Sequence, residues 1–234
     1  MCGIAGKLYY DPARPVEPEV LAAMSRMLVH RGPDDEGYYR RGNVGLAMRR
    51  LAVIDPLGGK QPIRNEDGTH WAICNGEIYN YRELRGDLQA RGHRFRSQSD
   101  AEVIVHLYEE HGSELPGHLN GMFALALWDE RERRLLLARD RLGVKPLFYA
   151  LLPDRLLFAS EIKAIRADRP PLTIDPMALN HYLSLLYIPA PESVYCQVRK
   201  LEPGHLHNGR QGSVSNPLNR YLDTERHLPV AEER

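Results

Sequence analysis

The sequence predicts an α+β fold in which antiparallel strands and helices form separate layers. Strand-like segments come in hairpin-like sets, the clearest being the apolar stretches 123–128 and 134–138 on either side of the charged turn 129–133. Segments with helical apolar spacing lie between these sets and do not alternate with single strands. This order favours a layered α+β architecture over a chain of βαβ units.

The first half of the chain predicts strands over residues 4–10, 44–54 and 70–74 and helices over 17–29 and 81–90. The first strand carries Cys2 at its edge. Residues 55–68 are rich in Gly, Pro, Asn and Asp and predict a loop. The third strand leads into Asn75-Gly76-Glu77, which is interpreted as a turn because Asn-Gly is a common hairpin turn.

The second half continues with a helix, the hairpin and two further strands. Ser99 with Glu102 three residues later fits a capping box, and Val103, Ile104 and Leu107 give the following helix an apolar face. The further strands are expected over residues 147–150 and 156–159.

The chain changes character after about residue 165. Prolines divide residues 166–234 into one short helix, expected over 177–186, and irregular segments. We therefore divide the chain into a domain over residues 1–165 and a connector over residues 166–234.

Composition excludes several functional classes. The 234 residues are 43% hydrophobic, and the 31 Lys and Arg balance the 31 Asp and Glu, which argues against a nucleic-acid or membrane-surface protein. The longest apolar run, residues 122–128, is far shorter than the ~20 residues of a membrane helix. Three cysteines at unrelated spacings form neither a disulfide framework nor a zinc site, and no signal peptide is visible. A cytoplasmic location is expected.

The beginning of the chain, Met1-Cys2-Gly3-Ile4-Ala5-Gly6, predicts a catalytic cysteine. Methionine is normally removed before a small residue, which would leave a thiol and a free α-amine on Cys2. The reference pKa of an α-amine, about 7.7–8.0, is near that of a thiol, about 8.5, so the amine can act as a base for its own side chain.

Other residues supply what thiolate attack on a carboxamide requires. The Asn75 side chain and the Gly76 N–H can donate hydrogen bonds to an oxyanion. An arginine such as Arg50 suits a carboxylate, and acidic groups suit an ammonium. A free α-amino acid carries both charges, so this inventory fits glutamine.

These motifs together resemble the glutaminase domain of class II glutamine amidotransferases, which are N-terminal nucleophile hydrolases, and most of all the glutamine-hydrolysing asparagine synthetase branch. The stretches that carry the resemblance are residues 1–6, 30–34, 50–55, 61–62, 75–80, 99–104, 121–124, 139–149 and 160–164. Segments 188–191, 198–201 and 203–205 resemble the connector that leads to the synthetase domain.

The resemblance implies a fold and a set of roles. The fold is a four-layer αββα sandwich of two antiparallel sheets. Cys2 is the expected nucleophile, with Asn75 and Gly76 forming the oxyanion hole. Arg50 is expected to bind the α-carboxylate of glutamine, while Asp100 and Glu77 receive its α-ammonium.

The expected reaction is hydrolysis of L-glutamine to L-glutamate and ammonia through a γ-glutamyl thioester, for asparagine synthesis from aspartate and ATP. Neither a metal nor a cofactor is expected for it. ATP and magnesium would belong to a synthetase domain, whose Ser-Gly-Gly-x-Asp-Ser loop does not occur in this sequence. The expected partners are glutamine and an ammonia-accepting synthetase domain or subunit, and a homodimer is left open.

Two alternatives stay open at this point. One is a glutaminase that serves another acceptor, as in the sugar-phosphate or phosphoribosyl branches. The other is a catalytically silent regulatory module with the same fold. The tail adds one departure from the family, since Leu222 stands where tryptophan is usual.

Overall fold

The structure, a computed structural model, describes residues 1–210 and 218–221 and contains two antiparallel six-stranded sheets. The first sheet has the strand order β10-β8-β9-β1-β3-β2 and the second β12-β11-β7-β6-β5-β4. The strands are β1 (Gly3–Tyr9), β2 (Asp35–Arg41), β3 (Val44–Arg50), β4 (Ile63–Arg64), β5 (His70–Ile78), β6 (Gly121–Asp129), β7 (Arg134–Arg139), β8 (Phe148–Leu151), β9 (Arg155–Ala159), β10 (Val198–Lys200), β11 (His205–Arg210) and β12 (Leu218–Arg220).

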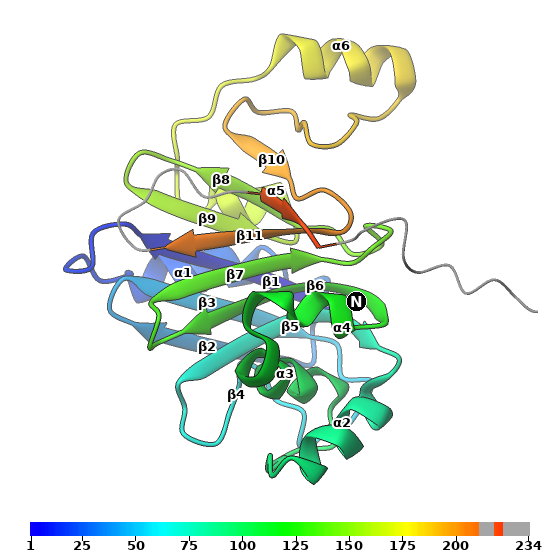
Figure 1. Cartoon of the computed structure of the whole chain (residues 1–234). Coiled ribbons are helices and arrows are strands. Elements are labelled where there is room, and N and C mark those ends of the chain that lie inside the picture. The colour runs from blue at the N-terminus through cyan, green and yellow to red at the C-terminus, as the bar shows by residue number, and fades with distance from the viewer. Residues whose placement is uncertain (211–217, 222–234) are drawn as a thin grey trace, which may run out of the picture.

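Helices cover the outer faces of both sheets. The α-helices are α1 (Pro18–Arg26), α2 (Tyr81–Ala90), α3 (Val103–His111), α4 (Leu115–His118), α5 (Ile162–Arg166) and α6 (Pro176–Leu185), and the 3₁₀ turns are η1 (Asp100–Glu102) and η2 (Gly112–Glu114). Helices α2, α3 and α4 lie on one side of the molecule, and α1 and α5 lie on the other (Figure 1).

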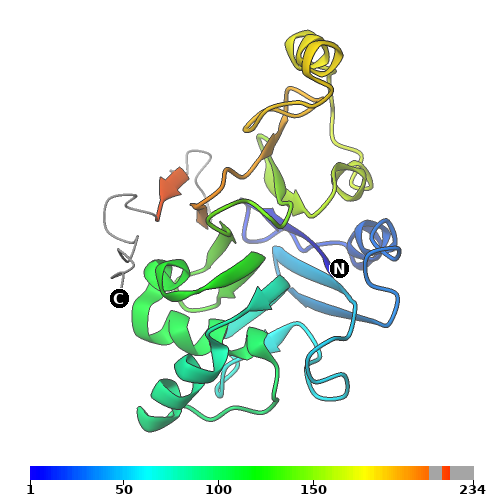
Figure 2. The same ribbon diagram turned by 90° about the vertical axis from the view of Figure 1, so that its right-hand side faces the viewer.

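The buried side chains form three main clusters, one between the two sheets and one between each sheet and its helices. Ile4 and Leu46 of the first sheet pack against Ala126 and Trp128 of the second. A second cluster joins α2, α3 and α4 to the second sheet, and a third joins α1 and α5 to the first sheet. This is the αββα sandwich that the resemblance implies, so the expected fold class is confirmed (Figure 2).

Most of the predicted elements are present with shifted ends. The strand predicted over 44–54 ends at Arg50, and the loop over 55–68 contains the two-residue strand β4. The sequence analysis misses β2 entirely. This strand lies at the edge of its sheet and carries charged, exposed residues, as edge strands often do, so it shows little apolar signal.

The description of residues 166–234 as one helix and irregular segments is wrong for three strands. The helix is found as α6, but β10 extends the first sheet beside β8, and β11 extends the second sheet beside β7, with β12 beyond it. The connector therefore contributes edge strands to both sheets, and the division at residue 165 stays a prediction. Leu222 lies outside the described residues.

Candidate active site

Cys2 precedes the first residue of β1 and is held by one backbone and one side-chain hydrogen-bond donor. Its Sγ accepts a hydrogen bond of 3.4 Å from the Leu51 N–H, and its carbonyl oxygen accepts one of 2.9 Å from Arg31 Nε. Arg31 in turn pairs with Glu161 at 3.0 Å. Burial raises the pKa of the Cys2 thiol, and the Leu51 N–H offsets only part of that rise.

Asn75, Gly76 and Glu77 lie inside strand β5 rather than in a turn, which corrects the sequence-based interpretation. Gly76 is the register partner of Phe123 on β6. A Cβ atom on Gly76 would lie 2.2 Å from the Met122 carbonyl oxygen, so no side chain fits there. The glycine of the Asn-Gly pair is thus explained by close packing of two strands.

The hydrogen-bond pattern of β5 directs the Gly76 N–H toward the site. The Phe123 carbonyl accepts from Asp140 N, on the side away from β5, so Gly76 and Phe123 form a non-hydrogen-bonded pair. The N–H groups of Cys74 and Ile78, two residues to either side, face the same open edge. There they donate to Gln61 Oε1 at 2.7 Å and to Asp100 Oδ2 at 2.8 Å. Gly76 N–H points between them.

Asn75 offers a donor that nothing in the described part of the chain uses. The residue is 1% exposed, and its Nδ2 has no hydrogen-bond partner among the described residues. Because side chains alternate along a strand, Asn75 faces the layer between the sheets, where Ile73 packs. A buried amide without a partner is costly unless a ligand or water satisfies it.

Two carboxylates lie near each other at the end of β5. Asp100 is 6% exposed, and burial is the main reason why its pKa is raised. The pKa of Glu77 is also raised, by burial and then by the charge of Asp100, while the buried Lys145 acts in the opposite direction. The pair would gain from a cation placed beside it.

Arg50 stands at the end of β3, 4% exposed, and holds the loop that follows it. Its guanidinium donates to the carbonyl oxygens of Ile54, Asp55 and Pro56 at 2.7–3.0 Å. Within this loop a Cβ atom on Gly59 would lie 2.7 Å from the same guanidinium. Arg50 therefore has a structural task in addition to the ligand role predicted for it.

One pocket brings most of the predicted residues together. Its lining consists of Cys2, Arg50, Leu51, Val53, Ile54, Gln61, Cys74, Gly76, Glu77, Ser99 and Asp100. Asn75 is the one predicted site residue outside that lining. The cavity volume is about 20 Å³, which is enough for roughly one water molecule.

Sequence reasoning missed several neighbours of this pocket. Gln61 and Leu51 occur only within the motifs that carry the resemblance, and no site role is predicted for Cys74, yet all three line the pocket. Arg31 lies in the motif of residues 30–34 without a predicted role, yet its side chain donates to the Cys2 carbonyl oxygen. The sequence alone does not predict this contact, because it joins residues 29 positions apart.

The capping box predicted at Ser99 is half correct. Ser99 Oγ accepts from Ala101 N at 3.3 Å and so caps η1. Glu102 does not return to Ser99. Its carboxylate accepts from the backbone N–H groups of Arg96 and Ser97 at 2.6 and 2.8 Å, which anchors the segment before η1.

The two-sheet sandwich has counterparts among known proteins. A glutamine phosphoribosylpyrophosphate amidotransferase from B. subtilis matches 95% of this chain and 50% of its own with a TM-score of 0.69 and 18% sequence identity. This likeness supports the fold alone.

Sequence comparison is more specific. The family model described as a glutamine amidotransferase domain matches residues 1–222, so the chain belongs to that family. Asparagine synthetase [glutamine-hydrolyzing] 1 of Bacillus subtilis is 41% identical over 206 residues, covering 87% of this chain and 33% of the relative. Asparagine synthetase [glutamine-hydrolyzing] 3 of Arabidopsis thaliana is 44% identical over 169 residues, covering 72% of this chain and 29% of the relative. The chain thus spans about a third of the length of these relatives.

No helix in the described residues combines the length and apolar composition needed to cross a bilayer.

Proposed function

We propose that this chain hydrolyses L-glutamine to L-glutamate and ammonia through a γ-glutamyl thioester on Cys2. The observation that carries the proposal is the single pocket that Cys2, Arg50, Glu77 and Asp100 line together. Cys2 would attack the side-chain amide of glutamine. Arg50 suits its α-carboxylate, and Glu77 and Asp100 suit its α-ammonium. Membership of the glutamine amidotransferase domain family supports the same reaction.

The raised pKa of the Cys2 thiol means that a base must take its proton. Removal of Met1 supplies that base as the α-amine of Cys2 itself. The thiol sulfur attacks the γ-carbonyl carbon as its proton passes to the amine, and the negative oxygen is bound by Asn75 Nδ2 and the Gly76 N–H. The proton then goes to the leaving nitrogen, ammonia departs, and water hydrolyses the thioester to glutamate and the free thiol.

Charge recognition follows from the two carboxylates. An α-ammonium beside Asp100 and Glu77 would remove the like-charge repulsion that helps to raise the pKa of Glu77. Arg50 would bind the α-carboxylate in a bidentate geometry that lysine lacks.

Substrate binding requires movement, because a cavity of about 20 Å³ is too small for glutamine. The loop of residues 51–59 closes the site through the three bonds from Arg50. We infer that this loop opens as Arg50 exchanges part of those carbonyl partners for the carboxylate of glutamine.

The ammonia acceptor is proposed to be a synthetase domain or subunit that makes asparagine. The curated relatives named above are asparagine synthetases, more than twice as long as this chain. Helix α6 projects from the sandwich (Figures 1 and 2), and it and the residues after it expose Met177, Tyr182, Leu183, Leu186 and Tyr187. Such an apolar face suits a second domain. ATP and magnesium would act in that domain, and a homodimer and a cytoplasmic location stay predictions.

The test is a glutaminase assay that measures glutamate and ammonia from the purified chain. Mass spectrometry first establishes whether Met1 has been removed. We expect Cys2→Ala to abolish turnover, while Cys74→Ser, which changes the other thiol lining the pocket, keeps most of it. Turnover that survives in Cys2→Ala would exclude the thioester. Full activity with Met1 retained would exclude only the α-amine as base. Turnover in neither the wild type nor Cys74→Ser would favour the silent module.

A further inference from the structure

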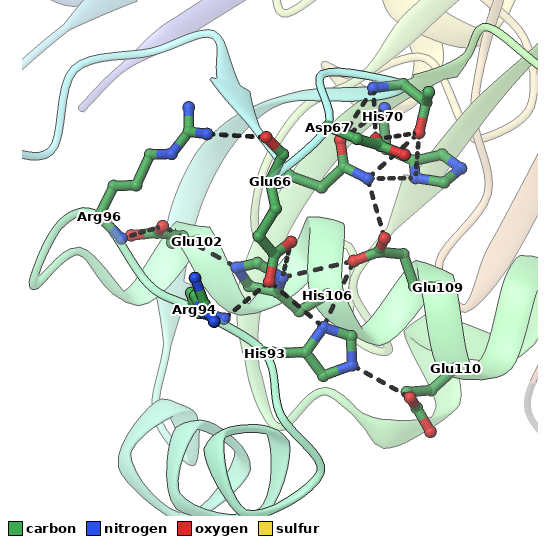
Figure 3. A network of polar contacts seen from close by, with 12 residues as sticks. Glu66, Asp67, His70, His93, Arg94, Arg96, Glu102, His106, Glu109 and Glu110 are labelled. Atoms are coloured by element: carbon green, nitrogen blue, oxygen red, sulfur yellow. Dashed lines mark hydrogen bonds and ion pairs between the residues drawn. The ribbon is translucent and has the colours of Figure 1, made fainter.

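A second cluster of polar side chains lies on the helical side of the second sheet, apart from the Cys2 pocket. Glu66 comes from the loop between β4 and β5, His93 from the segment after α2, and His106 and Glu109 from one turn of α3. Each offers one ligand atom, and these four atoms all lie within 4.8 Å of one another. Figure 3 shows the four side chains converging on a common point.

We propose that Glu66, His93, His106 and Glu109 form a structural zinc site. Zinc in structural sites is bound tetrahedrally by four protein ligands, and histidine nitrogen and carboxylate oxygen are both among its usual donors. Four protein ligands leave no open position, so the site would serve stability rather than catalysis.

The distances within the cluster fit that geometry. Two ligands bound to zinc at about 2.0–2.1 Å with a tetrahedral angle lie about 3.3–3.4 Å apart. The His106 Nδ1 atom is 3.3 Å from Glu66 Oε2 and 3.4 Å from Glu109 Oε2. The His93 Nδ1 atom is 3.4 Å from Glu109 Oε2 and 3.8 Å from Glu66 Oε1. Small side-chain rotations would place all four around one ion.

The surroundings of His106 give a second observation that supports the site. It is 0% exposed, and its ring nitrogens have only ion-pair contacts with carboxylates, Nδ1 with Glu66 and Glu109 and Nε2 with Glu102 at 3.9 Å. None of these contacts has the geometry of a hydrogen bond. Buried polar groups are nearly always hydrogen-bonded, and here three carboxylates surround a ring that makes no well-directed hydrogen bond, an arrangement that suits a bound cation. A zinc ion between His106 Nδ1 and the carboxylates of Glu66 and Glu109 would satisfy that nitrogen.

The residues that hydrogen-bond to the four proposed ligands also support a metal site. His93 Nε2 lies 3.0 Å from Glu110 Oε1, the carboxylate–histidine arrangement that orients a metal-binding ring. Glu109 Oε1 accepts from Asn65 Nδ2 at 2.9 Å, and Glu66 Oε1 accepts from Arg94 N at 2.7 Å. Across the described chain, neither Glu66 nor Glu109 is paired with a lysine or arginine.

An ion can also reach the site. A surface hollow of about 310 Å³ is lined by Glu66, Asp67, Gly92, His93, Arg94 and Glu109. The side chains of Glu66 and Glu109 are 33% and 26% exposed, so their oxygens are accessible from it.

The competing occupant is a proton. Burial lowers the pKa of His106, but the carboxylates of Glu102, Glu109 and Glu66 raise it to about 9. In the absence of metal the ring therefore carries a charge that balances the carboxylates. Zinc requires neutral histidine, so its binding would release protons.

The experiment is zinc titration of the full chain after removal of metals with a chelator, followed by calorimetry and by X-ray absorption at the zinc edge. We expect one zinc per chain, a rise in melting temperature, and ligands at about 2.0–2.1 Å without sulfur. The variants are His93→Ala and Glu109→Gln, both at partly exposed positions, because His106→Ala could fail to fold. Each of these two variants should weaken zinc binding at least ~10-fold. Even the loss of a residue that only hydrogen-bonds to a metal ligand commonly costs about that much affinity.

His111→Ala is the matched control. His111 stacks on His118 with ring centroids 3.8 Å apart, so this neighbouring histidine pair could bind zinc adventitiously. Its substitution should leave the zinc affinity unchanged. Three results would each overturn the proposal: no zinc bound, a cysteine sulfur ligand at about 2.3 Å from the zinc, as from the exposed Cys196, or affinity lost in His111→Ala but kept in His93→Ala.

Discussion

The Asp100 carboxylate accepts a hydrogen bond of 2.8 Å from the backbone N–H of Ile78. This bond fastens η1 to the end of β5 and leaves the Gly76 N–H, two residues earlier, facing the pocket. Asp100 therefore has two tasks, one in holding the strand end and one predicted in binding the α-ammonium of glutamine. A useful variant must separate them.

Asp100→Asn separates the two tasks because its amide oxygen can still accept from Ile78 N–H while the charge is lost. We expect near-normal melting temperature and a loss of ~2–5 kcal/mol in transition-state stabilisation, measured as kcat/KM for glutamine. Asp100→Ala should in addition lower the melting temperature.

A glutamine analogue without the α-amine is the control for that assignment. On the analogue, wild type and Asp100→Asn should differ little, whereas Arg50→Lys should stay impaired. If Asp100→Asn lost the same activity on both substrates, Asp100 would be left with its structural role alone.

Asn75 provides the test of the oxyanion hole, because the other predicted donor cannot be changed. Any side chain at Gly76 would meet the backbone of β6. Asn75→Ala removes the unpartnered Nδ2 and should lower kcat ~10²–10³-fold with little change in KM. Steady-state kinetics measures both quantities. A raised KM with normal kcat would instead assign Asn75 to ground-state binding.

The contact between Arg31 and the Cys2 carbonyl predicts a positioning role. Burial raises the pKa of Glu161, but hydrogen bonds from Arg31, Lys163 and His30 prevail and lower it to about 2, so Glu161 is a charged anchor. We expect Glu161→Gln to loosen Arg31 and lower kcat by about 10- to 100-fold, because a small misplacement of a nucleophile is costly. KM should change little.

Asp154→Asn is the control for Glu161→Gln. Asp154 also pairs with arginines, Arg14 at 2.8 Å and Arg155 at 2.6 Å, but none of the three lines the pocket. It should leave kcat unchanged. Equal effects of the two variants would show that kcat responds to any lost ion pair and not to the position of Cys2.

The sequence predicted the core strands because their apolar periodicity comes from burial. The hairpin of β6 and β7 is an example, since Leu125, Leu127 and Leu136 pack under α3. Edge strands such as β2 and β10 could not be predicted in this way, because they are short or charged and depend on partners far along the chain. The turn predicted at Asn75-Gly76 is wrong because the reason for the glycine, its close packing on β6, is a tertiary contact.

The candidate sites differ in the same respect. Cys2, Arg50 and Asp100 could be proposed from motifs, and the structure brings them to one pocket. The Glu66 cluster could not be found from spacing, because its members come from three segments and only His106 and Glu109 share a helix turn. Tertiary folding alone brings these residues together.

The last prediction concerns stability in acid and rests on His207 in β11. His207 is 0% exposed and stacks on Tyr149 of the other sheet with ring centroids 5.5 Å apart. Burial lowers its pKa to about 4, below the ordinary value of 6.5. The unfolded chain therefore binds a proton more readily than the folded one between these two values, and stability falls as pH decreases through that range.

The expected size is about 2 kcal/mol lost between pH 7 and pH 5 through this residue alone. Urea unfolding at both pH values measures it. His207→Phe keeps a ring for Tyr149 to stack on and removes the titrating group, so its stability should fall about 2 kcal/mol less than that of the wild type over the same interval. Comparing the two proteins cancels the carboxylates, which titrate in both. If the wild type and His207→Phe lost the same stability between pH 7 and pH 5, His207 would already be accessible to protons in the folded state.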